Sequence, residues 1–150
     1  MKLLSLGIVF IATLFSNCKD EVKNTEIVKI EFGTSFGMCA GYCTQILTVT
    51  RGNVAKVVIP RMDKNLQKKT CESSYSGYNA LISELDVDAF MSLEETIGCP
   101  DCADGGAEWV EITTAEVSKK VTYEYGKTPD ALLSIIDELK RQYNTLDECD

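Results

Sequence analysis

Six of the seven cysteines lie beyond position 38, and they are the side chains of this chain best suited to chemistry. Two pairs are close in sequence, in the segments CAGYC (residues 39–43) and CPDC (99–102). Cysteines at such spacings form disulfides, act as a redox dithiol or bind zinc as thiolates. The other two, Cys71 and Cys149, stand alone. The compartment in which the protein works therefore decides which chemistry applies.

The residues around CPDC favour structural disulfides. A reactive C-x-x-C normally begins a helix whose N-terminus lowers the thiol pKa, whereas the segment ADGG (103–106) that follows is typical of a loop. A zinc site built from Cys39, Cys43, Cys99 and Cys102 fits the spacings, but an oxidising compartment disfavours thiolate ligands. We favour bridges 39–43, 99–102 and 71–149, and pairings that cross the two clusters stay open as alternatives.

The seventh cysteine, Cys18, ends an apolar N-terminal segment. Lys2 precedes residues 3–15 (LLSLGIVFIATLF), a run that is typical of a secretory signal and shorter than a membrane span of about 20 residues. Ser16, Asn17 and Cys18 resemble the lipobox of bacterial lipoproteins, in which the cysteine receives a diacylglycerol and the chain is cut before it. The alternative is an ordinary signal peptide that leaves Cys18 as a thiol.

The lipobox resemblance implies a signal peptide at residues 1–17 and a lipidated tether at residues 18–25. Lys19, Asp20 and Glu21 resemble the export signal that sends Bacteroidota-type lipoproteins to the outer face of the outer membrane. If Cys18 carries lipid, an even set of six cysteines is left for disulfides. The sequence therefore predicts an outer membrane lipoprotein that is exposed at the surface.

Composition narrows the class of function. The chain has 150 residues, a net charge of −8 and no histidine. Its length predicts one globular domain, at residues 26–150. The acidic balance disfavours nucleic acid, which needs Lys and Arg against its phosphates. The missing histidine removes Ser-His-Asp and Cys-His nucleophile systems, and we expect no cofactor.

Alternating apolar residues predict the strands that must hold the cysteine loops. We expect strands at 26–32, 44–50, 54–59, 109–114 and 121–125, with the second and third, and the last two, forming hairpins. Val28, Ile30 and Phe32 should share one face of the first strand, and Val110 and Ile112 should point inward. Residues 61–76 have no clear period and are expected to form an extended or edge segment.

Two helical regions follow from one-turn spacing of apolar residues. Residues 78–93 look helical in part, with Asp86 and Asp88 splitting the segment. A final helix should begin at Thr128, its N-cap, with Pro129 in the first position. Its apolar stripe consists of Leu132, Ile135, Ile136, Leu139, Tyr143 and Leu146. Asp137 and Arg141, four residues apart, are expected to form an ion pair on the exposed side.

This order of elements predicts the fold class. We expect an α+β domain with two layers, in which a small antiparallel sheet carries two helices on one face. The order along the chain would be strand, hairpin, helix, hairpin, helix.

Two further groups of side chains deserve comparison with binding sites. Asp101 and Asp104, with Glu94, Glu95 and Glu108 nearby, have ligands for Ca²⁺ but lack the spacing of a calcium loop, so we favour a solvated acidic loop. Tyr42, Tyr75 and Tyr78 are potential aromatic anchors for a protein or glycan partner. Ordinary, partly buried tyrosines are the interpretation that we favour.

The segment GMCAGYC (37–43) and the following strand TQILTVTRGN (44–53) resemble an uncharacterised domain family of Bacteroidota-type lipoproteins, in which a cysteine-bearing loop precedes a β-hairpin. The resemblance covers roughly residues 26–146 and implies fold and location, with no activity to carry over. We therefore expect a non-enzymatic, lipid-anchored envelope protein that binds a partner or serves a structural role, held on the membrane by its lipid. The alternative is a redox or metal-binding protein that uses CPDC and CAGYC.

Overall fold

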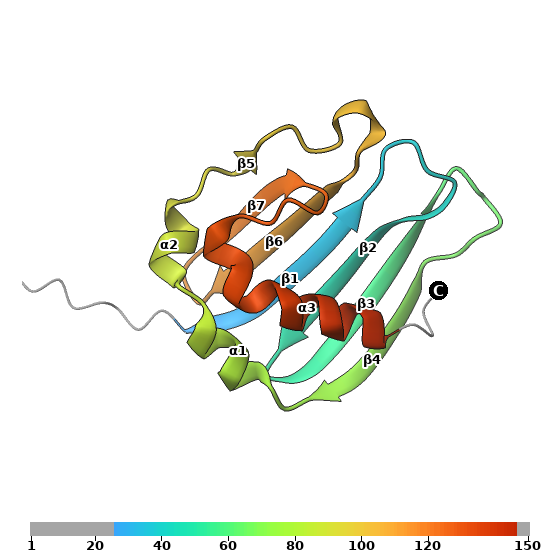
Figure 1. Cartoon of the computed structure of the whole chain (residues 1–150). Helices are drawn as coiled ribbons and strands as arrows, with labels where there is room; N and C mark the ends of the chain where they lie inside the picture. The colour runs from blue at the N-terminus through green and yellow to red at the C-terminus, as the bar shows by residue number, and fades with distance from the viewer. Residues whose placement is uncertain (1–25, 147–150) are drawn as a thin grey trace, which may run out of the picture.

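A computed structural model describes residues 26–146 of the chain (Figure 1). The predicted signal peptide, the lipidation site Cys18 and the export residues Lys19, Asp20 and Glu21 lie outside these residues, as does Cys149. No helix within residues 26–146 is long and apolar enough to span a membrane.

One seven-stranded sheet forms the body of the molecule. Its strands lie side by side in the order β4-β3-β2-β1-β6-β7-β5. All neighbours are antiparallel except β5 and β7, which are parallel. The strands are β1 (Ile27–Ser35), β2 (Gly41–Thr50), β3 (Gly52–Arg61), β4 (Lys69–Tyr75), β5 (Thr96–Ile97), β6 (Ala107–Thr114) and β7 (Ser118–Glu124).

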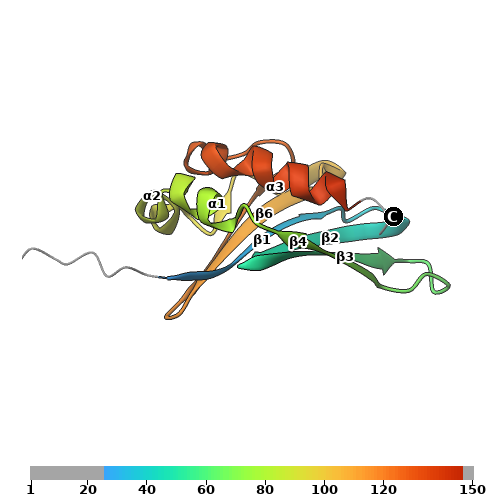
Figure 2. The same ribbon diagram turned by 90° about the horizontal axis from the view of Figure 1, so that it is seen from below.

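Three short helices, α1 (Tyr78–Glu84), α2 (Val87–Ser92) and α3 (Leu133–Thr145), lie over one face of this sheet. Within residues 26–146, the opposite face has no helix on it (Figure 2). Two short 3₁₀ helices, at Cys102–Asp104 and Asp130–Leu132, complete the elements of the described residues.

The predicted fold class is wrong. A two-layer α+β domain with a small antiparallel sheet, two helices and paired hairpins was expected, whereas a seven-stranded mixed sheet dominates and carries three short helices. The mixed pairing comes from β5, whose two residues are too few to show an alternating pattern. The edge strand β4 (KTCESSY) is mostly exposed, so its sequence has no apolar face.

The core lies between the sheet and the helices. Ile30, Phe32, Val110 and Ile112 of the central strands are at most 1% exposed. The inner stripe of the last helical segment packs on them: Leu132, Ile135, Ile136 and Leu139 are all buried. Each such side chain contributes about 1.5–3 kcal/mol to folding when fully buried, and α3 is therefore fixed on the sheet by its apolar side.

A bulge near the start of β1 changes which residues face the core. The register between β1 and β6 shifts between Ile27 and Lys29. Ile27 is consequently 6% exposed and Val28 is 44% exposed. The expectation that Val28 shares the inner face with Ile30 and Phe32 is wrong, because the extra residue of a bulge moves the preceding side chains to the other face.

The final helix also begins later than predicted. Pro129 and residues Asp130–Leu132 form the 3₁₀ turn, and α3 begins only at Leu133. Neither helical start has a side-chain cap, so the expected N-cap role of Thr128 is not formed. By contrast, Asp86 caps α2: its side chain accepts a hydrogen bond from the Ala89 amide at 2.9 Å. The segment 78–93 is accordingly split at Asp86 into α1 and α2.

Candidate functional site

The two sequence-local cysteine pairs are disulfide-bonded, Cys39 to Cys43 and Cys99 to Cys102. Cys71 is disulfide-bonded as well. Its predicted partner, Cys149, lies outside the described residues, so that pairing stays a prediction. All five described cysteines are thus oxidised, which is the state expected in an exported protein.

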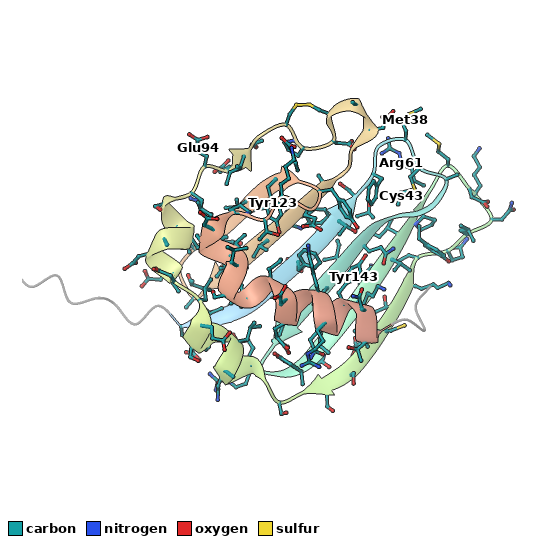
Figure 3. The ribbon with its side chains drawn as sticks, viewed as in Figure 1. Met38, Cys43, Arg61, Glu94, Tyr123 and Tyr143 are labelled. Atoms are coloured by element: carbon teal, nitrogen blue, oxygen red, sulfur yellow. A yellow bond between two sulfur atoms is a disulfide. The ribbon has the colours of Figure 1, made fainter. Side chains whose placement is uncertain are left out.

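The two disulfide loops lie against each other at one end of the sheet, where Met38 and Cys43 are labelled in Figure 3. The Gly37 amide donates to Asp101 Oδ1 at 3.0 Å and joins them. Phe36, which precedes the CAGYC loop, packs against Tyr125, with the two ring centroids 4.9 Å apart. Gly106 has φ = 79°, and a Cβ there would meet the ring of Phe36. The sequence clusters are therefore neighbours in space, joined by polar and aromatic contacts.

This arrangement holds four sulfurs as two separate disulfides, and none is free as the thiolate that a zinc site uses. Residues 26–146 contain no group of three or more His, Cys, Asp or Glu side chains positioned around a common metal site. Of the acidic residues considered for Ca²⁺, Asp101 accepts the Gly37 amide and Glu108 lies elsewhere, under α3. The acidic residues of this segment are therefore not gathered into one ligand set.

A polar row crosses the helix-covered face of the sheet. In the pairing of four neighbouring strands, Gln45, Thr34, Glu108 and Tyr123 stand opposite one another in turn. Residues opposite one another point to the same face of a sheet. The pair Thr34 and Glu108 follows the core pair Phe32 and Val110 as the next inward-facing pair of β1 and β6. The row therefore lies between the apolar core and the end of the sheet that carries the disulfide loops.

Glu108 is the charged centre of this row. It is 2% exposed, and a buried carboxylate needs a partner. Lys140 of α3 supplies one: its Nζ lies 3.1 Å from Oε1 and 3.1 Å from Oε2 of Glu108. The ammonium also stands 5.8 Å from the centroid of the Phe32 ring. The ion pair thereby ties the second half of α3 to β6.

A cavity of about 160 Å³ opens beside this ion pair, between α3 and strands β1 and β6. We call it the α3 cavity. Three aromatic side chains and four polar ones line it: Phe32, Tyr125, Tyr143, Thr34, Glu108, Lys140 and Asn144.

Tyr143 holds the aromatic wall of the α3 cavity in place. Its ring meets Phe32 edge-on, with centroids 5.6 Å apart, and its hydroxyl is 3.3 Å from Thr34 Oγ1. Lys56, which is 1% exposed, places its Nζ 4.4 Å from the centroid of the same ring. Such an ammonium over an aromatic face is attractive. The wall is therefore fixed by contacts from both sheet and helix.

Two buried polar atoms of the row, Gln45 Oε1 and Tyr123 OH, make no hydrogen bond of normal geometry among residues 26–146, although Thr128 and Glu108 lie near the Tyr123 hydroxyl. Tyr123 (labelled with Tyr143 in Figure 3) is fully buried. Burial raises the pKa of its phenol above the ordinary value, and the nearby negative charge of Glu108 raises it further. The row thus retains hydrogen-bonding capacity on both sides of Thr34 and Glu108.

A second hollow, of about 300 Å³, lies between α1, α3 and the end of β4. Glu138 is its most connected side chain. The carboxylate accepts from Tyr75 OH at 2.9 Å, from Arg141 at 2.7 and 2.8 Å, and from Gln142 at 3.0 Å. The expected Asp137–Arg141 pair is wrong, because Arg141 turns to Glu138 instead. These contacts occupy both oxygens of the Glu138 carboxylate.

Tyr42, Tyr75 and Tyr78, the aromatic anchors considered from sequence, all have partners within the chain. Tyr78 is 3% exposed and donates to the Ile27 carbonyl at 2.5 Å. Tyr75 is 6% exposed and bonds Glu138. Tyr42 donates to the Gln67 carbonyl at 3.2 Å and carries Lys69 over its ring at 4.7 Å. Tyr75 and Tyr78 are therefore core tyrosines, and Tyr42 is a half-buried surface one.

The α3 cavity was missed in the sequence analysis, although a signal for it existed. Glu108 has the same strand parity as Val110 and Ile112, which were expected to face inward. An acidic residue on an inward-facing position predicts either a buried partner or a site. Its partner Lys140 lies 32 residues away, and only the packing of α3 brings the two together.

No family model matches the chain, and no curated protein matches it. The resemblance of GMCAGYC to a lipoprotein domain family therefore stays a prediction.

Proposed function

We propose that this chain is a lipid-anchored binding protein of the cell envelope, without enzymatic activity, and that the α3 cavity is its binding site. The observation that supports this most directly is the oxidised state of all five described cysteines, because disulfides persist in exported proteins. The segment before them supplies the export and anchoring signals: a signal peptide at residues 1–17, lipid on Cys18, and a surface address at Lys19, Asp20 and Glu21.

The α3 cavity supports binding better than catalysis. Its strongest acid and base, Glu108 and Lys140, neutralise each other through contacts to both carboxylate oxygens. Aromatic side chains form most of its apolar wall, and concave sites with aromatic walls and a few convergent polar groups are typical of ligand binding. The proposed role is therefore to hold a small molecule at the outer membrane surface.

Replacement of Cys18 by Ser tests the anchor. The Cys18→Ser variant should lose the mass of the lipid, because serine has no sulfur to receive the diacylglycerol. Asn17→Ser, one position earlier, is the matched control and should keep both lipid and membrane association. Intact-mass spectrometry of the mature protein measures the lipid, and a membrane-bound, lipidated Cys18→Ser protein would refute the anchor.

Replacement of Lys19, Asp20 and Glu21 by Ala tests the surface address. The triple variant should stay lipidated but lose exposure at the cell surface, measured by protease treatment of intact cells. The matched control replaces Lys23, Asn24 and Thr25 of the same tether and should not change exposure. Equal surface exposure of the two variants would refute the export signal at Lys19, Asp20 and Glu21.

A further inference from the structure

We infer that the α3 cavity binds a single pyranose sugar ring, as a free glycoside or as one residue of a surface glycan. This inference rests on the binding function proposed above and names the class of its ligand. Three properties of the cavity carry it: its size, its aromatic wall and the balance of its polar groups.

The size of the α3 cavity fits one six-membered ring. Its volume is about 160 Å³, and a cavity of about 150 Å³ accommodates a ring such as benzene. Tyr125 is 48% exposed and Asn144 is exposed, so both lie at the rim. Ring substituents can extend past these two residues into solvent. A chain of sugars can therefore place one residue in the cavity without burying the rest.

The aromatic wall matches one face of a pyranose. Phe32 and Tyr143 stand edge to face at 5.6 Å, and Tyr125 is held at the rim by its contact with Phe36 at 4.9 Å. A pyranose has an apolar face made of C–H groups and a periphery of hydroxyls. Tyrosine rings suit such a ligand because they combine an apolar body with a polar tip. The C–H face would pack on Tyr125 and Tyr143, with hydroxyls directed away from the wall.

The polar groups of the α3 cavity come as balanced donors and acceptors. Glu108 accepts and Lys140 donates, while Asn144 and the hydroxyls of Thr34 and Tyr143 do both. A ligand that is only a cation would meet Lys140, and one that is only an anion would meet Glu108. Vicinal hydroxyls, each a donor and an acceptor, can bridge the ion pair without breaking it. Neutral polyhydroxylated rings are therefore favoured over ions.

The test uses the full-length protein, extracted into a zwitterionic detergent that carries no sugar. The probes are the methyl pyranosides of glucose, galactose, mannose and N-acetylglucosamine, measured by saturation-transfer NMR and calorimetry. At least one probe should bind, with a Kd on the order of 1 mM. Tyr125→Ala and Asn144→Ala, both at the exposed rim, should each weaken binding about tenfold or more.

Thr145→Ala is the matched control for Asn144→Ala, because it lies on α3 next to the rim but does not line the cavity. It should bind within about twofold of the unaltered protein, and circular dichroism should show all three variants folded. No binding up to about 100 mM, or equal binding by rim variants and control, would overturn the sugar site. Tetramethylammonium or acetate that binds in the cavity where the pyranosides do not would overturn it as well.

The mass of the lipid on Cys18 is measured on the same preparation. A lipidated protein that binds no pyranoside refutes the sugar site and leaves the anchor standing. A protein that binds a pyranoside but carries no lipid refutes the anchor and leaves the sugar site standing. The two proposals can therefore fail separately.

Discussion

Tyr123 and Tyr78 are two buried tyrosines whose hydroxyls have opposite surroundings. The Tyr78 hydroxyl donates to the Ile27 carbonyl at 2.5 Å, whereas that of Tyr123 makes no hydrogen bond of normal geometry among residues 26–146, although Thr128 and Glu108 lie near it. A buried hydroxyl without a partner keeps the cost of leaving water and gains no bond in return. The same chemical change at the two positions should therefore alter stability in opposite directions.

We predict that Tyr123→Phe raises the free energy of unfolding by about 1 kcal/mol, because it removes an unpaired polar group from the core. Tyr78→Phe should lower it by about 1 kcal/mol, because it leaves the Ile27 carbonyl unpaired. Urea denaturation of both variants in the absence of ligand measures the two values. Destabilisation by Tyr123→Phe would mean that its hydroxyl makes a bond in the folded protein.

The sequence predicted correctly which side chains face the core wherever strand alternation or helical spacing determines the face. The inner stripe of α3 and the inward positions of Val110 and Ile112 are as expected, because apolar periodicity is a local property. Val28 was misplaced because a bulge has no apolar signature of its own. Glu108 and Lys140 could not be paired in advance, since their contact depends on the docking of α3 on β6 and not on local spacing.

At the scale of elements, Glu138 connects α3 to the end of β4. Burial raises the pKa of its carboxyl, but hydrogen bonds from Arg141, Gln142 and Tyr75 outweigh this and lower the net value. The contact also changes the pKa of Tyr75: burial and the hydrogen bond to Glu138 raise it to about 12. The contact therefore requires an ionised Glu138 and a protonated Tyr75.

We predict that Glu138→Gln lowers the free energy of unfolding at pH 7 by about 1–2 kcal/mol, because the four charge-assisted hydrogen bonds that its carboxylate accepts are weakened. Asp137→Asn is the matched control. Asp137 is exposed and its side chain makes no hydrogen bond or ion pair within residues 26–146, so this change should alter stability by less than about 0.5 kcal/mol.

The two variants distinguish the observed contact from the one expected by spacing alone. Chemical denaturation at pH 7 measures both. Equal losses for Glu138→Gln and Asp137→Asn would show that Arg141 divides its interaction between the two carboxylates. The i, i+4 rule predicted Asp137 as the partner because it considers the helix alone. Glu138 in fact receives a further hydrogen bond from Tyr75 of β4, outside the helix.

The element order was harder to predict than the helix faces. β4 and β5, the edge strands, have no apolar face or too few residues to show one, so they were not assigned as strands. Both are held by backbone pairing to a neighbour, and such pairing depends on the whole sheet. The error in fold class therefore came from the edges of the sheet, not from its centre.

At the scale of the whole molecule, stability should be nearly independent of pH across neutrality. The chain has no histidine, and all five described cysteines are in disulfides. The carboxyl pKa of Glu138 is lowered, so its contribution is complete above the ordinary value of 4.5 and is lost as pH falls through the lowered value. The phenol of Tyr75 contributes fully below 10.0, and this is lost as pH rises toward about 12.

We predict a flat free energy of unfolding between about pH 6 and 9, with losses in acid and above about pH 10. Urea denaturation at unit steps of pH measures the profile. Tyr75→Phe is the control and should show a smaller loss between pH 10 and 12 than the unaltered protein. A slope of more than about 1 kcal/mol per pH unit near pH 7 would contradict the prediction.

Trp109 is the single tryptophan of the chain, and it lies on β6. Its ring lies across Gly33 of the neighbouring strand, where any Cβ would meet it, and Lys120 stands 4.1 Å from the ring centroid. Because Val110 and Glu108 on either side face α3, Trp109 faces away from the α3 cavity. Because Trp109 is only 8% exposed, its fluorescence should report mainly the packing of Gly33 and Lys120 around the indole, on the face of the sheet opposite α3.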